Sequence, residues 1–136
     1  MIHYLWEKFP YKILTDPEYV DFDFVYQQLK NTYWAATRTR TQIAKAIAHA
    51  IPFNLYQEED QIGFARVITD KAVFAYLADV VIAPRYRGNG LGKWMVSCIL
   101  THPDLKGCKI LLETQDAHGL YAQFGFELRE SMKKQL

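Results

Sequence analysis

Two hydrophobic periods divide the chain. In its first third, apolar residues recur every three or four positions, which predicts helices. The first such stripe comprises Phe22, Val25, Tyr26, Leu29 and Tyr33. A second helix is predicted after Thr39, because Thr39 and Gln42 have the spacing of a capping box. Its apolar face comprises Ile43, Ile47, Ala50 and Ile51, and Pro52 is expected to end it.

The period changes to two between residues 53 and 82, which predicts strands. Residues 53–56, 61–69 and 73–82 are the strand candidates, and short polar turns separate them. Successive strands joined by short turns form an antiparallel meander. Residues 11–14 are an additional strand candidate that precedes both helices.

The last third of the chain alternates between the two periods. We predict a helix over residues 90–101, a strand over 108–113, a short helix over 117–124 and a last strand over 126–129. The predicted order is therefore β-α-α-β-β-β-α-β-α-β, an α/β (mixed α+β) fold. With 136 residues and no linker or repeat, residues 1–136 are expected to form a single domain.

Composition and charge narrow the classes of function. Half of the residues are hydrophobic and 15% are aromatic, which argues against disorder. The net charge is +1, so neither nucleic acid nor a membrane surface is an expected partner. The N-terminus does not have the pattern of a signal peptide, and Cys98 and Cys108 have no metal-ligand spacing with histidine. We therefore expect a cytoplasmic protein with reduced cysteines and no metal site.

A glycine-rich basic segment follows the third strand of the meander. Gly88, Gly90 and Gly92 lie directly before or within the start of the predicted helix. The first N–H groups of a helix have no partner within it, and glycines let a ligand approach them closely. Arg85, Arg87 and Lys93 add positive charge. This arrangement predicts a binding site for a diphosphate.

Three motifs compete for this segment. A P-loop requires different glycine spacing and a hydroxyl after the lysine, where this chain has Trp94. A dinucleotide fingerprint requires a third glycine at position 93, where this chain has Lys93. Residues 85–90, Arg-Tyr-Arg-Gly-Asn-Gly, resemble instead the Q/R-x-x-G-x-G/A signature of the GCN5-related N-acetyltransferase (GNAT) superfamily. The resemblance implies a mixed, mainly antiparallel sheet with splayed central strands flanked by helices, and acetyl-CoA as the donor.

A second segment, Tyr121-Ala122-Gln123-Phe124-Gly125-Phe126, resembles the Y-x-x-x-G-F sequence that closes many GNAT domains. In that family the tyrosine lies near the CoA sulfur and often serves as the general acid. The chemistry requires an acid that is still protonated at neutral pH, and a tyrosine with a pKa of about 10 meets this requirement. Tyr121 is the predicted acid, and an aromatic core residue is the alternative.

The resemblance also assigns the residues that hold the donor. Strand positions Val80, Val81 and Ile82 correspond to the backbone that binds pantetheine. Contacts to the pyrophosphate correspond to Arg87, Gly88, Asn89, Gly90, Leu91, Gly92 and Lys93. Thr114 stands where relatives often carry an asparagine that contacts the cofactor.

The general base is less well defined, because Ala78 and Phe74 stand where many relatives carry glutamate. Asp79 is the nearest carboxylate and could accept the amine proton if its pKa were raised above about 3.9. The alternative is that Asp79 holds a loop or a substrate ammonium by charge alone. Glu113 and His118 are further candidates.

Aromatic and basic residues between the first two helices and on the strands are expected to recognise the acceptor. The candidates are Trp34, Arg38, Arg66, Tyr76 and His118, with Tyr33 beside Trp34. They suit an acidic or aromatic amine, or they could pack only against the protein.

The resemblance supports an acetyl-CoA-dependent N-acetyltransferase that acts on a primary amine of a small molecule or peptide. A non-catalytic CoA-binding or regulatory module is the alternative, because the usual glutamate is missing. An acyltransferase with a longer acyl chain or a macromolecular target is a third hypothesis. A homodimer is compatible with the resemblance, since such folds often pair at the edge of the cleft.

Overall fold

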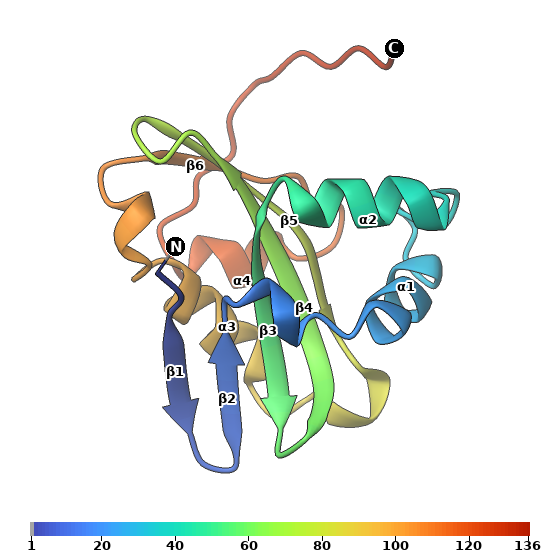
Figure 1. The fold of residues 1–136 in the computed structure, drawn as a ribbon. Helices are drawn as coiled ribbons and strands as arrows, with labels where there is room; N and C mark the ends of the chain where they lie inside the picture. Colours follow the sequence, from blue (N-terminus) through green and yellow to red (C-terminus); the bar gives the residue numbers. More distant parts are fainter. Residues whose placement is uncertain (1) are drawn as a thin grey trace.

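The centre of the fold is a curled sheet of six strands in the order β1-β2-β3-β4-β5-β6 (Figure 1). A computed structural model describes residues 2–136. The strands are β1 (Leu5–Lys8), β2 (Tyr11–Leu14), β3 (Ile51–Gln57), β4 (Asp60–Thr69), β5 (Phe74–Ile82) and β6 (Lys109–Leu111). All neighbouring strands are antiparallel except β5 and β6, which are parallel. The predicted mixed and mainly antiparallel sheet is confirmed.

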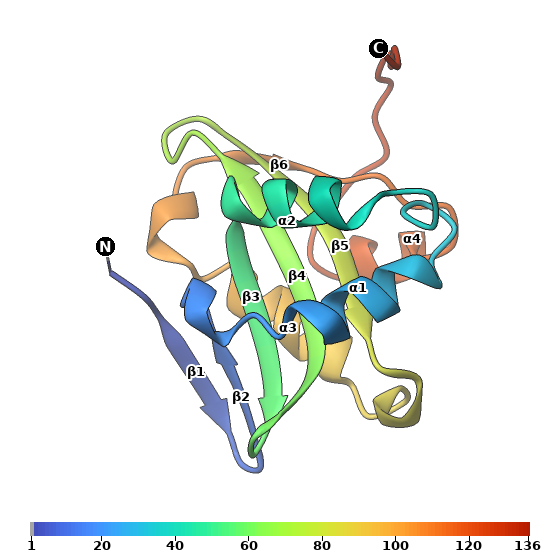
Figure 2. The same ribbon diagram turned by 45° about the vertical axis from the view of Figure 1, so that its right-hand side comes forward.

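Helices cover both faces of the sheet. On one face lie α1 (Phe22–Lys30) and α2 (Arg40–Ala48), as Figure 2 shows. On the other face lie α3 (Leu91–Ile99) and the short α4 (His118–Ala122). Each face has its own hydrophobic core: Val25 and Leu29 of α1 and Ile43 of α2 belong to one, whereas Met95, Val96 and Ile99 of α3 belong to the other. Among the described residues, 2–136, no helix has the length and apolar character that a membrane span requires.

Local sequence signals set the helix starts. The Asp21 side chain accepts a hydrogen bond from the Phe24 N–H and begins α1. Thr39 and Gln42 form the predicted capping box at the start of α2. However, α2 ends at Ala48, and Ile51 and Pro52 already belong to β3. The prediction that Ala50 and Ile51 extend the helical face was therefore wrong, because pairing of Ile51 with Val67 in the sheet takes precedence.

Two differences concern the ends of the sheet. The strand β1 was not predicted; it forms a hairpin with β2 across Phe9 and Pro10, and most of its residues are exposed. A strand alternates visibly in sequence only when one face is buried, and here Trp6 alone is half-buried. The predicted last strand, residues 126–129, is not formed. The chain there runs away from the body of the protein (Figure 1), and Leu128 is 83% exposed.

The central strands separate at one end. The pairing of β5 with β6 covers only three positions, Phe74 with Lys109, Ala75 with Ile110 and Tyr76 with Leu111. Beyond Tyr76, β5 continues to Ile82 without a strand on that side among residues 2–136. The backbone of residues 77–82 therefore has no strand partner on this edge within the described chain, as the splayed arrangement predicts, although the Ile82 carbonyl accepts from Arg87 Nε.

Candidate active site

A bulge in β5 places the Asp79 carboxylate at the centre of a cluster of polar side chains. Phe64 pairs with Val81, and Arg66 pairs with Ala78, so Asp79 and Val80 together lie opposite the single residue Ala65. Asp79 adopts a left-handed backbone with a φ of 58°. Aspartate and asparagine tolerate this conformation better than other non-glycine residues. The strand bends here, and the Asp79 side chain lies on the face that carries Arg66.

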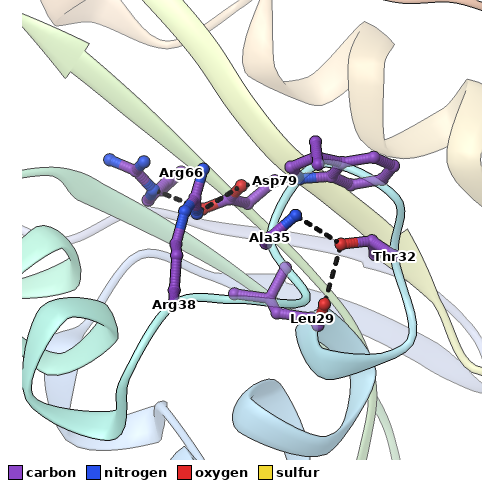
Figure 3. Close-up of polar contacts among 7 residues, drawn as sticks. Leu29, Thr32, Ala35, Arg38, Arg66 and Asp79 are labelled. Atoms are coloured by element: carbon purple, nitrogen blue, oxygen red, sulfur yellow. Dashed lines mark hydrogen bonds and ion pairs between the residues drawn. The ribbon is translucent and has the colours of Figure 1, made fainter. Parts of the chain in front are cut away.

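Four side-chain hydrogen bonds hold the Asp79 carboxylate. Arg66 donates from Nε to Oδ2 at 2.6 Å, and Arg38 donates from Nη1 to both oxygens at 3.0 and 2.9 Å. Trp34 donates from Nε1 to Oδ1 at 2.9 Å. Figure 3 shows Arg38 and Arg66 converging on Asp79 from different elements. Since the Asp79 side chain is only 2% exposed, this is a buried ion-pair cluster.

The surroundings of Asp79 favour the alternative to its predicted role as a base. Burial raises the pKa of the Asp79 carboxyl, but the hydrogen bond and charge of Arg66, together with Arg38 and Trp34, lower it further below its usual value. A base role required a raised pKa. This geometry favours the alternative, in which the charge of Asp79 holds Arg38, Arg66 and Trp34 in place. The role as a base stays a prediction.

The conformation of the loop between α1 and α2 places Trp34 and Arg38 beside Asp79. The Thr32 hydroxyl donates to the Leu29 carbonyl at 2.7 Å and accepts from the Ala35 N–H at 3.1 Å (Figure 3). Ala35 is buried in the core under α1. The buried Ala35 and the two hydrogen bonds of the Thr32 hydroxyl thus fix the backbone on both sides of Trp34.

A second pair joins β5 to the segment that follows β6. The Tyr76 hydroxyl donates to Glu113 Oε1 at 3.0 Å. Burial and the Glu113 carboxylate raise the pKa of Tyr76 to about 12. Nearby, the Tyr33 hydroxyl accepts from the Gln115 N–H at 3.0 Å, and the Tyr33 ring contacts Trp34 at 5.0 Å between centroids. The α1–α2 loop is thereby tied to the segment that leads into α4.

The glycine-rich loop presents the start of α3 without a cap. Gly88 and Gly90 have positive φ values of 84° and 74°, and Gly90 is the N-cap residue with no side-chain hydrogen bond to the helix. A Cβ atom at either glycine would meet nothing within 4 Å. Trp94 is the first residue of α3 whose N–H returns to the helix, to the Gly90 carbonyl at 2.9 Å. The preceding N–H groups are left for an external acceptor.

A cavity of about 300 Å³ lies at this helix start. Its lining residues are Ile82, Tyr86, Arg87, Gly88, Gly90, Leu91, Gly92, Lys93 and Leu120. Arg87 is held in place by a hydrogen bond of 3.0 Å from Nε to the Ile82 carbonyl, and its outer nitrogens have no partner among residues 2–136. Free N–H groups, two cationic side chains and open space above the glycines fit a diphosphate. The residues present therefore suit the phosphate end of CoA.

Tyr121 lies on α4, next to the cavity-lining Leu120. Its residue is 8% exposed, and its ring contacts Phe126 at 5.7 Å between centroids. Burial, with the nearby Asp116 and Tyr33, raises the pKa of the Tyr121 hydroxyl. A raised pKa keeps the phenol protonated at neutral pH, as a general acid requires. Its role as the acid stays a prediction.

The other residues predicted for the site have side chains that contact the protein or solvent. Val81 packs under α1 on the opposite face from Val80 and Ile82. The Asn89 side chain donates to the Tyr86 carbonyl, and the Thr114 hydroxyl accepts from the Ala117 N–H at 3.0 Å. His118 is exposed, and its side chain forms no hydrogen bond within the described chain. These side chains have structural or solvent roles here, although their backbones remain beside the site.

Sequence reasoning missed Tyr86 and Leu120 as lining residues. Tyr86 stands inside the signature and Leu120 directly before Tyr121, so adjacency to the two motifs was the available signal. Residues 2–136 contain no group of three or more His, Cys, Asp or Glu side chains placed to hold a metal ion.

Comparison with protein families gives a match to the acetyltransferase (GNAT) domain over residues 48–128, more than half of the chain. Among solved structures, a protein from Xanthomonas campestris pv. campestris assigned to the GNAT acetyltransferase family is 36% identical, with a TM-score of 0.88 over 93% of each chain. Glucosamine-6-phosphate N-acetyltransferase from Arabidopsis thaliana is 16% identical, with a TM-score of 0.62 over 100% of this chain and 99% of that chain. This last likeness concerns the fold alone.

Two curated relatives extend the comparison. A Gibberella zeae protein assigned as an acetyltransferase is 29% identical over 69% of this chain, and the match spans 64% of that protein's length. The spermine/spermidine N(1)-acetyltransferase of Bacillus subtilis is 30% identical over 77% of this chain and 78% of its own length. The family match, the shared fold and the glycine-rich loop agree: the chain belongs to the GNAT acetyltransferase family.

Proposed function

We propose that this chain is an acetyl-CoA-dependent N-acetyltransferase that acetylates a primary amine of a small molecule or peptide in the cytoplasm. The observation that carries the proposal is the uncapped start of α3, which opens into a cavity lined by Arg87 and Lys93. Acetyl-CoA supplies the acetyl thioester when it is bound. The open edge of β5 offers backbone groups to its pantetheine arm, like an added strand.

The reaction requires two proton movements. A C–N bond forms between the acceptor nitrogen and the acetyl carbon, the C–S bond breaks, the nitrogen loses a proton and the sulfur gains one. Tyr121 is our candidate to donate the proton to sulfur. Glu113 is our candidate to receive the amine proton, because its carboxylate is exposed and held by Tyr76, whereas Asp79 is occupied by two arginines.

Isothermal titration with acetyl-CoA, CoA and NADH tests donor binding. We expect acetyl-CoA and CoA to bind and NADH not to bind. Release of CoA thiol in the presence of a broad amine panel then tests transfer. Absence of acetyl-CoA binding would overturn the proposal.

The occupied state of Asp79 favours a second candidate function, a CoA-binding regulatory module without catalysis. That protein would bind CoA tightly and release no thiol with any amine. Saturable turnover with an amine would exclude this alternative.

A further inference from the structure

The ion-pair cluster around Asp79 contains more positive charge than it neutralises. Two guanidinium groups, Arg38 and Arg66, face one carboxylate, which leaves one unit of positive charge. An unbalanced charge in a desolvated position is costly unless an anion completes it. The cluster is therefore suited to a singly charged acidic group of a ligand.

Arg66 has donors that the protein does not use. Its residue is 8% exposed, and only Nε is hydrogen-bonded within residues 2–136. The two outer nitrogens point away from Asp79 in Figure 3. Arg38 likewise uses only Nη1. No buried side-chain nitrogen or oxygen of the described residues lacks a partner, so the unused nitrogens of Arg66 and Arg38 reach solvent and can donate to an acceptor.

The strand face beside Arg66 is open to solvent and mostly apolar. Phe64 is buried under α1, but Ile68, on the same face of β4, is 40% exposed. Ile68 lies beside Tyr76, which in turn lies beside Leu111 on β6. A molecule whose acidic group meets Arg66 would therefore lay an apolar part across this row.

We infer that the acceptor is an amino acid with an apolar or aromatic side chain, whose carboxylate binds Arg38 and Arg66. This inference rests on the proposed function and names the class of its acceptor. The planar guanidinium matches a carboxylate through two parallel hydrogen bonds. A residual charge of one unit suits a carboxylate better than a doubly charged phosphate. A polyamine, the substrate class named for the Bacillus subtilis relative, would be repelled by the two arginines.

Matched acceptor pairs test the inference. Each pair differs only in the carboxylate: tyrosine and tyramine, tryptophan and tryptamine, lysine and cadaverine. CoA thiol release is measured with each, and with spermidine and glucosamine 6-phosphate. We expect the carboxylated member of the aromatic pairs to have at least a tenfold higher kcat/KM than its amine.

Two variants test whether Arg38 and Arg66 cause the preference for the carboxylated acceptor. Arg66→Gln and the more exposed Arg38→Gln are each expected to reduce it by at least tenfold, mainly through KM. Arg40→Gln is the control, because Arg40 forms an exposed pair with Asp23 on the neighbouring helices. Calorimetric binding of acetyl-CoA should be unchanged in all three variants, which separates this inference from the proposed donor site. If Arg66→Gln does not fold, Arg38→Gln alone decides.

Several results would overturn the inference while leaving donor binding intact. These are equal or better turnover of the decarboxylated amines, preference for spermidine, preference for glucosamine 6-phosphate, or no turnover with any amino acid of the panel. Loss of acetyl-CoA binding by the wild-type protein would instead overturn the proposed function itself.

Discussion

Leu77 and Val81 lie four residues apart on β5, yet their side chains pack into opposite cores of the protein. Leu77 packs in the core beneath α3, and Val81 packs in the core beneath α1 and α2. Residues four apart in a regular strand share a face, so the bulge at Asp79 reverses the alternation. This reversal brings a buried carboxylate and two arginines to the face where we place the acceptor.

Replacing the Asp79 carboxylate should destabilise the fold. Asp79→Asn preserves the shape and tolerates the left-handed backbone, but it leaves Arg66 and Arg38 without a counter-charge. Breaking a buried pair in this way costs about 3 kcal/mol, which denaturant unfolding would measure. In the control Asp23→Asn, which removes the exposed partner of Arg40, we expect a loss below about 1 kcal/mol. Equal losses in both variants would contradict the assignment.

The Asp79 carboxylate should also make the free energy of unfolding depend on pH under acidic conditions. The folded pKa of Asp79 is lowered, so its contribution is complete above the ordinary value of 3.8 and is lost as pH falls through the folded pKa. The difference in free energy of unfolding between wild type and Asp79→Asn should therefore be constant near neutrality and shrink only below pH 3.8. A difference that already shrinks around pH 6 would point to another group.

His102 should make the stability of the protein depend on pH in a higher range than Asp79 does. It is 3% exposed, packs edge-on against Tyr4, and accepts a hydrogen bond at Nδ1 from the Asp104 N–H at 3.1 Å. Burial lowers its pKa, so the folded protein loses stability as pH falls below 6.5. His102→Asn retains an acceptor for the Asp104 N–H but does not titrate. We expect thermal denaturation of this variant to vary less than that of wild type between pH 7 and pH 5.

Two neighbouring glycines should respond in opposite ways. Gly90→Ala forces a side chain into a positive φ and should cost roughly 1–2 kcal/mol of stability. Gly92 has no positive φ, and its added Cβ would lie 3.8 Å from Ile82 Cγ1, an ordinary contact. Gly92→Ala should therefore raise stability by up to about 1 kcal/mol. Thermal denaturation of both variants without ligand checks this contrast.

CoA binding tests a second role of Gly90, which is to leave room for the diphosphate at the helix start. Gly90→Asp adds a carboxylate to the helix start where we place the diphosphate. CoA affinity should fall at least tenfold, about 1.4 kcal/mol, in calorimetric titration. Gly90→Ala serves as its control for backbone strain. Unchanged affinity in Gly90→Asp would refute the placement of the diphosphate.

Tyr121→Phe tests the general acid. Removal of the hydroxyl should lower kcat by about 100-fold while CoA affinity stays within about twofold. The raised pKa of Tyr121 further predicts that activity does not decline through tyrosine ionisation as pH approaches 10. A variant that binds CoA poorly but turns over normally would make Tyr121 a binding or packing residue.

Much of the fold could be predicted because its signals are local. The capping box of Thr39 and Gln42 and the glycines before α3 each lie within a few adjacent residues. Where an element depended on a partner strand, prediction failed: β1 exists only as a hairpin with β2, and residues 126–129 have a strand-like pattern but no neighbouring strand among residues 2–136.

The sequence by itself determined the family and predicted the diphosphate loop and the candidate acid, because each depends on residue types at short, fixed spacing. Only the tertiary structure shows which groups surround Asp79. Its partners Arg66, Arg38 and Trp34 are 13, 41 and 45 residues away in the chain. Whether a carboxylate is a base or the centre of an ion-pair cluster depends on burial and neighbouring charge, and folding alone brings those groups together.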